Sequence, residues 1–136
     1  MLSPTWATVR LFVHVVAATV WVGGQLTLAG LVPGLRALGD DAPRRVARRF
    51  NQIAWPAFAV LVVTGVWNLL AIDVGNTSIE YQVTLGLKIA LAALSGVAAA
   101  VHAGTSSRAV LAASGAVSGL AALGAVFLGV LLRSGA

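Results

Sequence analysis

Residues 10–36 read RLFVHVVAATVWVGGQLTLAGLVPGLR, and no Asp, Glu, Lys or Arg lies between the two arginines that bound this stretch. About 20 predominantly apolar residues suffice for a helix to cross a bilayer, so the stretch is predicted to form a membrane-spanning helix. His14, Trp21 and Gln25 recur in it at the spacing of one helical face. We therefore expect an imidazole, an indole and an amide to share one stripe that faces other helices.

The composition of the whole chain predicts an integral membrane protein. Of its 136 residues, 59% are apolar and 10% are charged, and the mean hydropathy is +0.94. These values lie far from those of an average soluble domain. Four long segments without fixed charge alternate with short charged connections, which make consecutive helices antiparallel neighbours. We predict an all-α integral membrane four-helix bundle with up-down-up-down topology. It forms a single domain over residues 1–136, with helices at about 8–32, 47–72, 82–104 and 108–133.

The charges predict how the chain lies in the membrane. The net charge of +5 and the pI near 11.5 would suggest a nucleic-acid partner for a soluble chain. Here most basic residues gather between the first and second spans instead, so membrane lipid is expected as a partner and nucleic acid is not. By the positive-inside rule this connection and the one at Arg108 are cytoplasmic, and both termini lie outside the cell inner (plasma) membrane. The basic residues of the first connection are Arg36, Arg44, Arg45, Arg48 and Arg49.

The second and third predicted helices carry three polar residues that apolar spans rarely contain. Asn68 lies near the outer end of the second helix, where its amide can reach a polar group on a neighbour or simply bond two helices together. Lys88 lies about two turns inside the third helix, where an unpaired ammonium is costly unless it snorkels outward. His102 shares a helical face with Lys88, and only small residues separate the two along that face. Such a face suits another helix or a flat ligand.

The fourth predicted helix carries two stripes of small residues, Ser114-xxx-Ser118 and Gly115-xxx-Gly119. Small residues at this spacing allow helices to approach closely in membranes. The stripes suit packing within the bundle or between protomers, and we expect a homo-oligomer.

Antiparallel threading predicts which polar groups lie at the same depth. The first and third helices run in the same direction, so His14 and Lys88 fall at a similar depth, whereas His102 lies about 21 Å deeper. An outer cluster would contain His14, Asn68, Lys88 and Tyr81. An inner cluster would contain His102, Asn51, Gln52 and Gln25.

An imidazole inside a span is a good axial ligand for haem iron. A basic side chain at similar depth, Lys88 or Arg10, can pair with a haem propionate, and a neutral lysine can itself be a ligand. Copper(I) sites use soft sulfur ligands, and the chain has no Cys and only Met1. We therefore expect haem b, with copper as the alternative. His14 is the leading metal ligand, and His102 is a candidate metal ligand of another haem or of a haem shared across an interface. Trp21 and Asn68 are expected beside the cofactor, and a hydrogen-bonded packing role is the alternative for His14.

A set of short motifs runs along the first three predicted helices. The motifs are His14-x6-Trp21-x-Gly23-Gly24, then Pro33 and Arg36, then Thr64-Gly65, and Leu87-Lys88. In these motifs the sequence resembles the copper-resistance protein D (CopD) domain family and the related HemJ-type protoporphyrinogen oxidases. The HemJ-type resemblance implies a small four-helix membrane protein with haem b, a haem role for His14 and an essential role for Lys88. The CopD resemblance implies a link to copper uptake.

These observations favour an electron-transfer or oxidoreductase role for a membrane haem b protein, with a quinone, porphyrin or small gaseous partner. All four acidic residues lie in predicted connections, so no catalytic residue is assigned. Three alternatives remain open. They are a copper or small-solute permease of the CopD type, a protoporphyrinogen oxidase of the HemJ type, and a structural membrane subunit without a cofactor.

Overall fold

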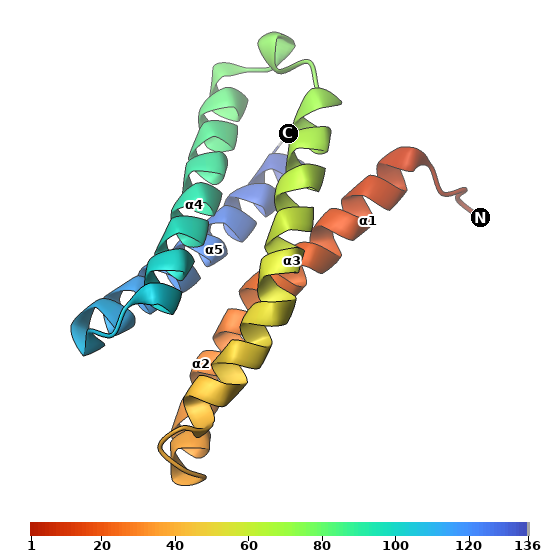
Figure 1. Cartoon of the computed structure of the whole chain (residues 1–136). Helices are drawn as coiled ribbons and strands as arrows, with labels where there is room; N and C mark the ends of the chain where they lie inside the picture. The colour runs from red at the N-terminus through yellow and green to blue at the C-terminus, as the bar shows by residue number, and fades with distance from the viewer. Residues whose placement is uncertain (136) are drawn as a thin grey trace. The chain divides into compact units, whose positions relative to one another are not determined.

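The computed structural model describes residues 1–135, and every regular element in them is helical. This confirms the all-α prediction. Long helical segments are joined by short connections (Figure 1). In chain order the elements are α1 (Trp6–Ala18), the π-helical turn η1 (Thr19–Gly23), α2 (Gly24–Ala37), α3 (Ala42–Leu70), the short 3-10 helix η2 (Val74–Asn76), α4 (Ile79–Gly104) and α5 (Arg108–Ser134).

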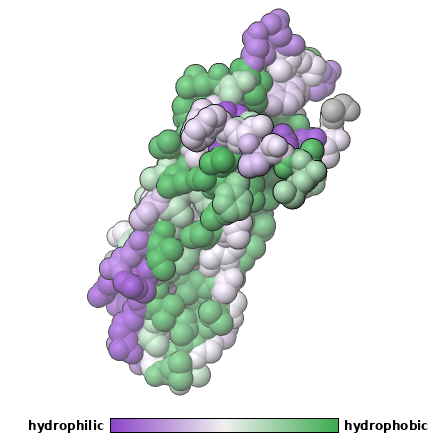
Figure 2. Space-filling model, turned by 90° about the vertical axis from the view of Figure 1, so that its right-hand side faces the viewer, coloured by the Kyte–Doolittle hydropathy of each residue, from purple (hydrophilic) through white to green (hydrophobic). Residues whose placement is uncertain are grey.

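Four helical segments are long and apolar enough to cross a membrane, as predicted. They are Trp6–Ala37, Ala42–Leu70, Ile79–Gly104 and Arg108–Ser134, and the first contains α1, η1 and α2 together. Large apolar side chains such as Phe12 and Phe127 are about two-thirds exposed, and Figure 2 shows that apolar residues cover most of the visible surface. Exposed apolar surface on this scale is unfavourable in water and suits contact with lipid chains.

The helix ends follow from local capping. The side chains of Thr5, Ser78 and Ser107 accept hydrogen bonds from backbone N–H groups in the first turns of α1, α4 and α5, which satisfies donors that a helix start leaves unpaired. The first predicted helix was expected to end near residue 32, but the helix continues through Pro33 to Ala37. A proline removes only one helical hydrogen bond, and membrane helices tolerate that loss.

Two compact units divide the chain, the first covering Met1–Ile72 and the second beginning at Asp73. In the first unit, α3 returns antiparallel to the helix formed by α1, η1 and α2 (Figure 1). Trp21 of η1 is only 3% exposed, and its ring packs against Trp55 and Phe58 at centroid distances of 5.3 and 4.4 Å. The aromatic cluster therefore lies where the π-helical turn faces α3.

The second unit is an antiparallel hairpin of α4 and α5. Ser95 and Ser118 are both almost fully buried, and each hydroxyl donates to the other residue's backbone carbonyl at 2.9 Å. The buried alanines Ala98, Ala121 and Ala122 complete this contact of small side chains. Ser118, in one of the two small-residue stripes predicted for the fourth helix, therefore packs within the chain.

Candidate functional site

A pair of hydrogen-bonded side chains joins α1 to α3 inside the first unit. His14 Nδ1 lies 2.8 Å from the Oγ1 atom of Thr64, which is buried. The same hydroxyl lies 2.7 Å from the backbone carbonyl of Val60, one turn earlier on α3. That carbonyl can only accept, so the single hydroxyl proton of Thr64 goes to it, and Thr64 accepts from His14. We therefore assign the neutral imidazole a proton on Nδ1 and a lone pair on Nε2.

The imidazole of His14 lies beside Gly65 of α3, at ordinary van der Waals distance. A Cβ atom at this glycine would be 3.4 Å from Cε1 of His14. The ring is thus bounded by the Thr64 hydroxyl and by a stretch of α3 that has no side chain. Both contacts orient the imidazole.

A second polar pair lies one helical turn away from the first. Arg10 Nε donates to Oδ1 of Asn68 at 2.6 Å, and the guanidinium carbon lies 5.7 Å from the ring centroid of Trp67. Arg10 precedes His14 by four residues on α1, and Asn68 follows Thr64 by four residues on α3, so the antiparallel helices align the two pairs. No carboxylate among residues 1–135 forms a salt bridge with this guanidinium.

Together, Arg10, His14, Thr64 and Asn68 form what we term the α1–α3 polar pairs. The sequence analysis singled out Arg10, His14 and Asn68, and the structure brings these three together. It did not identify Thr64 as a partner of His14. The sequence did contain a signal for this arrangement. Arg10 and His14 on one helix, and Thr64 and Asn68 on the next, are each four residues apart, so the two antiparallel helices can pair them.

Trp21 lies on the same helix as His14, but its ring belongs to the aromatic cluster with Trp55 and Phe58. This cluster anchors η1 to α3. The expected place of Trp21 beside a cofactor stays a prediction.

Lys88 and His102 lie in the second unit, and both face α5. A Cβ atom at Gly129 would be 3.1 Å from Nζ of Lys88, so the lysine side chain lies across a glycine of α5. Similarly, a Cβ at Gly115 would be 3.0 Å from Nδ1 of His102. The shared face of α4 that the periodicity predicted is thus the face that packs on α5.

The two basic residues of α4 differ in their partners. His102 Nδ1 donates to the backbone carbonyl of Leu111 at 2.8 Å, which leaves the lone pair of the neutral ring on Nε2. His102 is exposed near the α4–α5 connection, whereas Lys88 is half-buried and forms no salt bridge with residues 1–135. The two residues therefore differ: His102 has a fixed acceptor, and Lys88 packs along Gly129 of α5.

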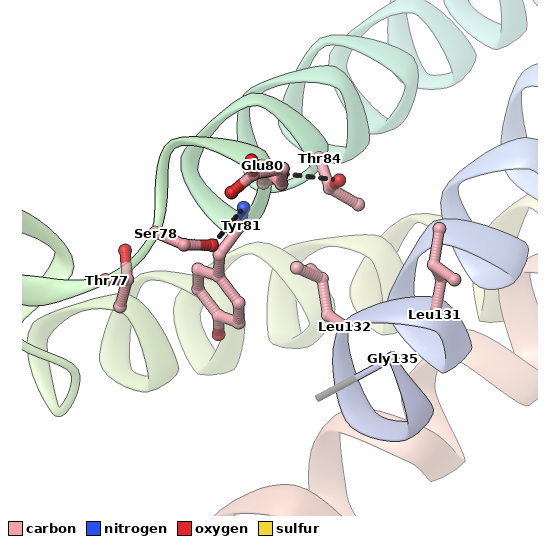
Figure 3. Close-up of a pocket in the computed structure, with 8 residues that line it drawn as sticks. All are labelled: Thr77, Ser78, Glu80, Tyr81, Thr84, Leu131, Leu132 and Gly135. Carbon is pink, nitrogen blue, oxygen red and sulfur yellow. Dashed lines mark hydrogen bonds between the residues drawn. The ribbon is translucent and has the colours of Figure 1, made fainter.

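The predicted outer and inner clusters each combine residues of both units, so they stay predictions as whole clusters. Within the first unit, Gln52 of the inner set accepts from Nη1 of Arg49 at 2.8 Å. Tyr81 of the outer set lines a depression of about 420 Å³ in the second unit. Figure 3 shows its ring beside Leu132 of α5. The lining residues are Thr77, Ser78, Glu80, Tyr81, Thr84, Leu131, Leu132 and Gly135.

The chemistry of the donor set limits which metals can be held. Among residues 1–135, no group of three or more His, Cys, Asp or Glu side chains is placed to hold a metal ion. A bare ion needs several protein donors, whereas haem iron already has four porphyrin nitrogens and needs only one or two. Single histidines such as His14 suit haem better than a bare ion.

Comparison with known proteins gave no match to any family model, curated protein or solved structure. The resemblance to the CopD and HemJ-type families therefore stays a prediction from short motifs. The geometry of the polar pairs carries the functional interpretation.

Proposed function

We propose that this protein binds haem b within the membrane, with His14 as an axial ligand through Nε2, and that it acts in electron transfer or related oxidoreductase chemistry. The proposal starts from the bond between His14 Nδ1–H and Thr64, an arrangement that a packing histidine shares, and the motif resemblance adds the reason to favour a haem ligand. Histidines that bind metals almost always donate their other ring N–H to an oxygen acceptor, which fixes the ring and the tautomer. His14 has this arrangement inside an apolar helix pair.

Arg10 is the first candidate partner for a haem propionate. Its guanidinium lies one turn from His14 and is held by Asn68 and by the face of Trp67. Only Nε is committed to Asn68, so the terminal nitrogens retain donors that match a carboxylate in a two-bond geometry. Asn68 therefore acts as a positioning residue for Arg10.

Lys88 and His102 are the candidate contributions of the second unit. Within the second unit, Lys88 is a candidate by the motif resemblance, as a cation for a propionate or, when neutral, as a nitrogen ligand, and His102 has its lone pair on Nε2. When bound, haem b would supply one-electron redox chemistry for a quinone, porphyrin or small gaseous partner. His14 and Arg10 would hold and orient the group.

Copper is less well supported than haem. The described residues include no cluster of metal-binding side chains, and the chain has no Cys. Soft ligands are what copper(I) sites require. The motif resemblance supports haem b as well, since it implies that cofactor for the HemJ-type proteins.

The membrane arrangement follows from the basic residues. We place the connection between α2 and α3, and that between α4 and α5, on the cytoplasmic side of the inner membrane, with both termini outside. Five arginines lie in or beside the first connection and Arg108 lies at the second, whereas Asp73 and Glu80 lie near the opposite connection. A homo-oligomer belongs to the same proposal, since exposed small residues on α5 such as Ala113 and Ala116 permit close contact between protomers.

An absorption spectrum tests the haem proposal. The protein is expressed with ample haem precursor and purified in detergent, and spectra are recorded in the oxidised and reduced states. We expect a Soret band in the wild type that is lost in His14→Ala. His102→Ala is measured beside it, because His102 is the other candidate ligand and has the same Nδ1–H arrangement. A band that His14→Ala loses and His102→Ala keeps assigns the ligand to His14, and the converse assigns it to His102.

Far-UV circular dichroism shows whether His14→Ala retains its helices. A colourless wild-type protein would overturn the proposal, as would an unchanged Soret band in a folded His14→Ala protein.

A further inference from the structure

A groove lies at the end of the first unit where α2 meets α3. Its volume is about 610 Å³, and all of its lining belongs to the first unit. Six apolar residues and two arginines line it. They are Leu35, Leu38, Ala42, Arg45, Val46, Arg49, Phe50 and Ile53.

The two arginines lie on the same side of α3 as the apolar lining. Arg45 and Arg49 are one turn apart, so their guanidinium groups project from neighbouring positions on the helix surface. Arg45 contacts Asp41 at 3.4 Å with both side chains about 70% exposed, and Arg49 donates one Nη1 bond to Gln52 at 2.8 Å. Because a guanidinium has five N–H donors, both groups retain donors for a further anion.

We propose that this groove binds one anionic phospholipid, with an acyl chain along Leu35, Phe50 and Ile53 and the phosphate between Arg45 and Arg49. Apolar side chains and paired guanidinium groups in one groove match the two ends of such a lipid. The planar fork of arginine fits phosphate oxygens through two bonds. An acyl chain would cover apolar side chains that are otherwise exposed, such as Ile53 at 55%.

Charge complementarity selects an anionic over a zwitterionic lipid. Residues 36–49 contain five arginines against Asp40 and Asp41. A phosphatidylcholine carries its own ammonium group, which would lie among these cations, whereas phosphatidylglycerol carries only the phosphate charge. Basic pockets between helices on the cytoplasmic side are known to favour anionic headgroups.

The chain offers an internal control for this proposal. Arg44 and Arg48 come from the same segment and carry the same charge, but they do not line the groove. A diffuse attraction between a basic loop and an anionic membrane would depend on all four arginines alike. Binding of one lipid in the groove would instead depend on Arg45 and Arg49 and not on Arg44 and Arg48.

Native mass spectrometry of the full-length protein in detergent provides the test, with dioleoylphosphatidylglycerol and dioleoylphosphatidylcholine as probes. We expect one phosphatidylglycerol per chain, bound on the order of tenfold more tightly than phosphatidylcholine. The double variant Arg45→Gln/Arg49→Gln should lose this preference, and Arg44→Gln/Arg48→Gln should keep it. Ile53→Asn should weaken the binding of phosphatidylglycerol because it places an amide along the acyl chain.

Three results would overturn the proposal. They are equal binding of the two lipids by the wild type, an equal loss in both double variants, and full competition by glycerol 3-phosphate, which would show that the apolar lining is not used. Circular dichroism confirms that each variant is folded. The test does not involve haem, so it stands apart from the proposed function.

Discussion

His14 Nδ1 and Thr64 Oγ1 lie 2.8 Å apart, between two helices whose other contacts are largely apolar. The Thr64 hydroxyl already donates to Val60, so the histidine is the donor in this pair. The bond therefore both joins α1 to α3 and fixes the imidazole tautomer. A packing histidine and a haem ligand can share this geometry, and substitutions at Thr64 separate the two roles.

Thr64→Val should weaken haem binding about ten- to hundredfold, because it removes the oxygen that accepts from His14 while keeping the side-chain shape. Thr64→Ser retains the hydroxyl and should bind haem nearly as well as the wild type. The measurement is a titration of the purified apoprotein with haemin, followed by the Soret band. An unchanged haem affinity in Thr64→Val, together with reduced stability, would show that the bond only packs the helices.

Arg10→Gln tests the second polar pair. The variant keeps a group that can bond Asn68 but removes the positive charge, so it should lower haem affinity without unfolding the helix pair. Asn68→Leu should have a similar but smaller effect, since Arg10 keeps its charge and loses only its positioning. Haemin titrations of both variants, compared with Arg36→Gln as a control for general loss of positive charge, give the measurement. Equal affinities in all three variants would rule out Arg10 as a propionate partner.

The four spans could be predicted because the charged residues interrupt the apolar sequence so rarely. Hydrophobic length fixes a membrane helix almost by itself, since backbone groups in lipid must bond within the helix. The α1–α3 polar pairs were partly predictable for a related reason. Arg10, His14 and Asn68 lie near one end of two adjacent antiparallel helices, where apolar spans offer few other polar partners.

Other features depend on packing that no local pattern reveals. The π-helical turn at Thr19–Gly23 lies where Trp21 fits against Trp55 and Phe58. Its β-branched residues and Gly23 weaken an α-helix, but they do not specify a π-helical turn. Thr64 was missed as a partner of His14 because a threonine in a membrane helix commonly satisfies itself on the carbonyl four residues earlier, as this one also does. The helix likewise continues through Pro33 because of where it lies, since a membrane helix tolerates a proline that would commonly end a helix in water.

Gly24→Ala should destabilise the first unit by about 1–3 kcal/mol, because a Cβ at this position would overlap the ring of Phe50. Gly23→Ala is the matched control, since no atom lies within 4 Å of the Cβ it would add. The free energy of unfolding is measured by titration with sodium dodecyl sulfate and circular dichroism. Phe50→Leu should relieve the overlap when combined with Gly24→Ala, and a lack of any relief would show that another contact is responsible.

Ser95→Ala should cost about 0.6 kcal/mol, a typical value for one interhelical hydrogen bond in a membrane protein. Ser95→Leu should cost several times more, because Ser95 is only 1% exposed and a larger side chain would force α4 away from α5. Ser134→Ala is the control, since its hydroxyl is exposed and bonds only within α5. The same unfolding titration measures all three, and a Ser95→Leu protein as stable as the wild type would contradict the close packing of this hairpin.

The orientation of the chain can be tested with single thiols, because the sequence has no cysteine. Ser3 and Ser106 are both exposed and lie at opposite ends of membrane-spanning helices, so Ser3→Cys and Ser106→Cys are conservative reporters. The positive-inside rule places Ser106, beside Arg108, in the cytoplasm and Ser3 outside. A membrane-impermeant maleimide added to intact spheroplasts should therefore label Ser3→Cys, and it should label Ser106→Cys only after the membrane is opened. The opposite labelling would place the arginine-rich connection outside, and the lipid groove at Arg45 and Arg49 would then face the outer leaflet.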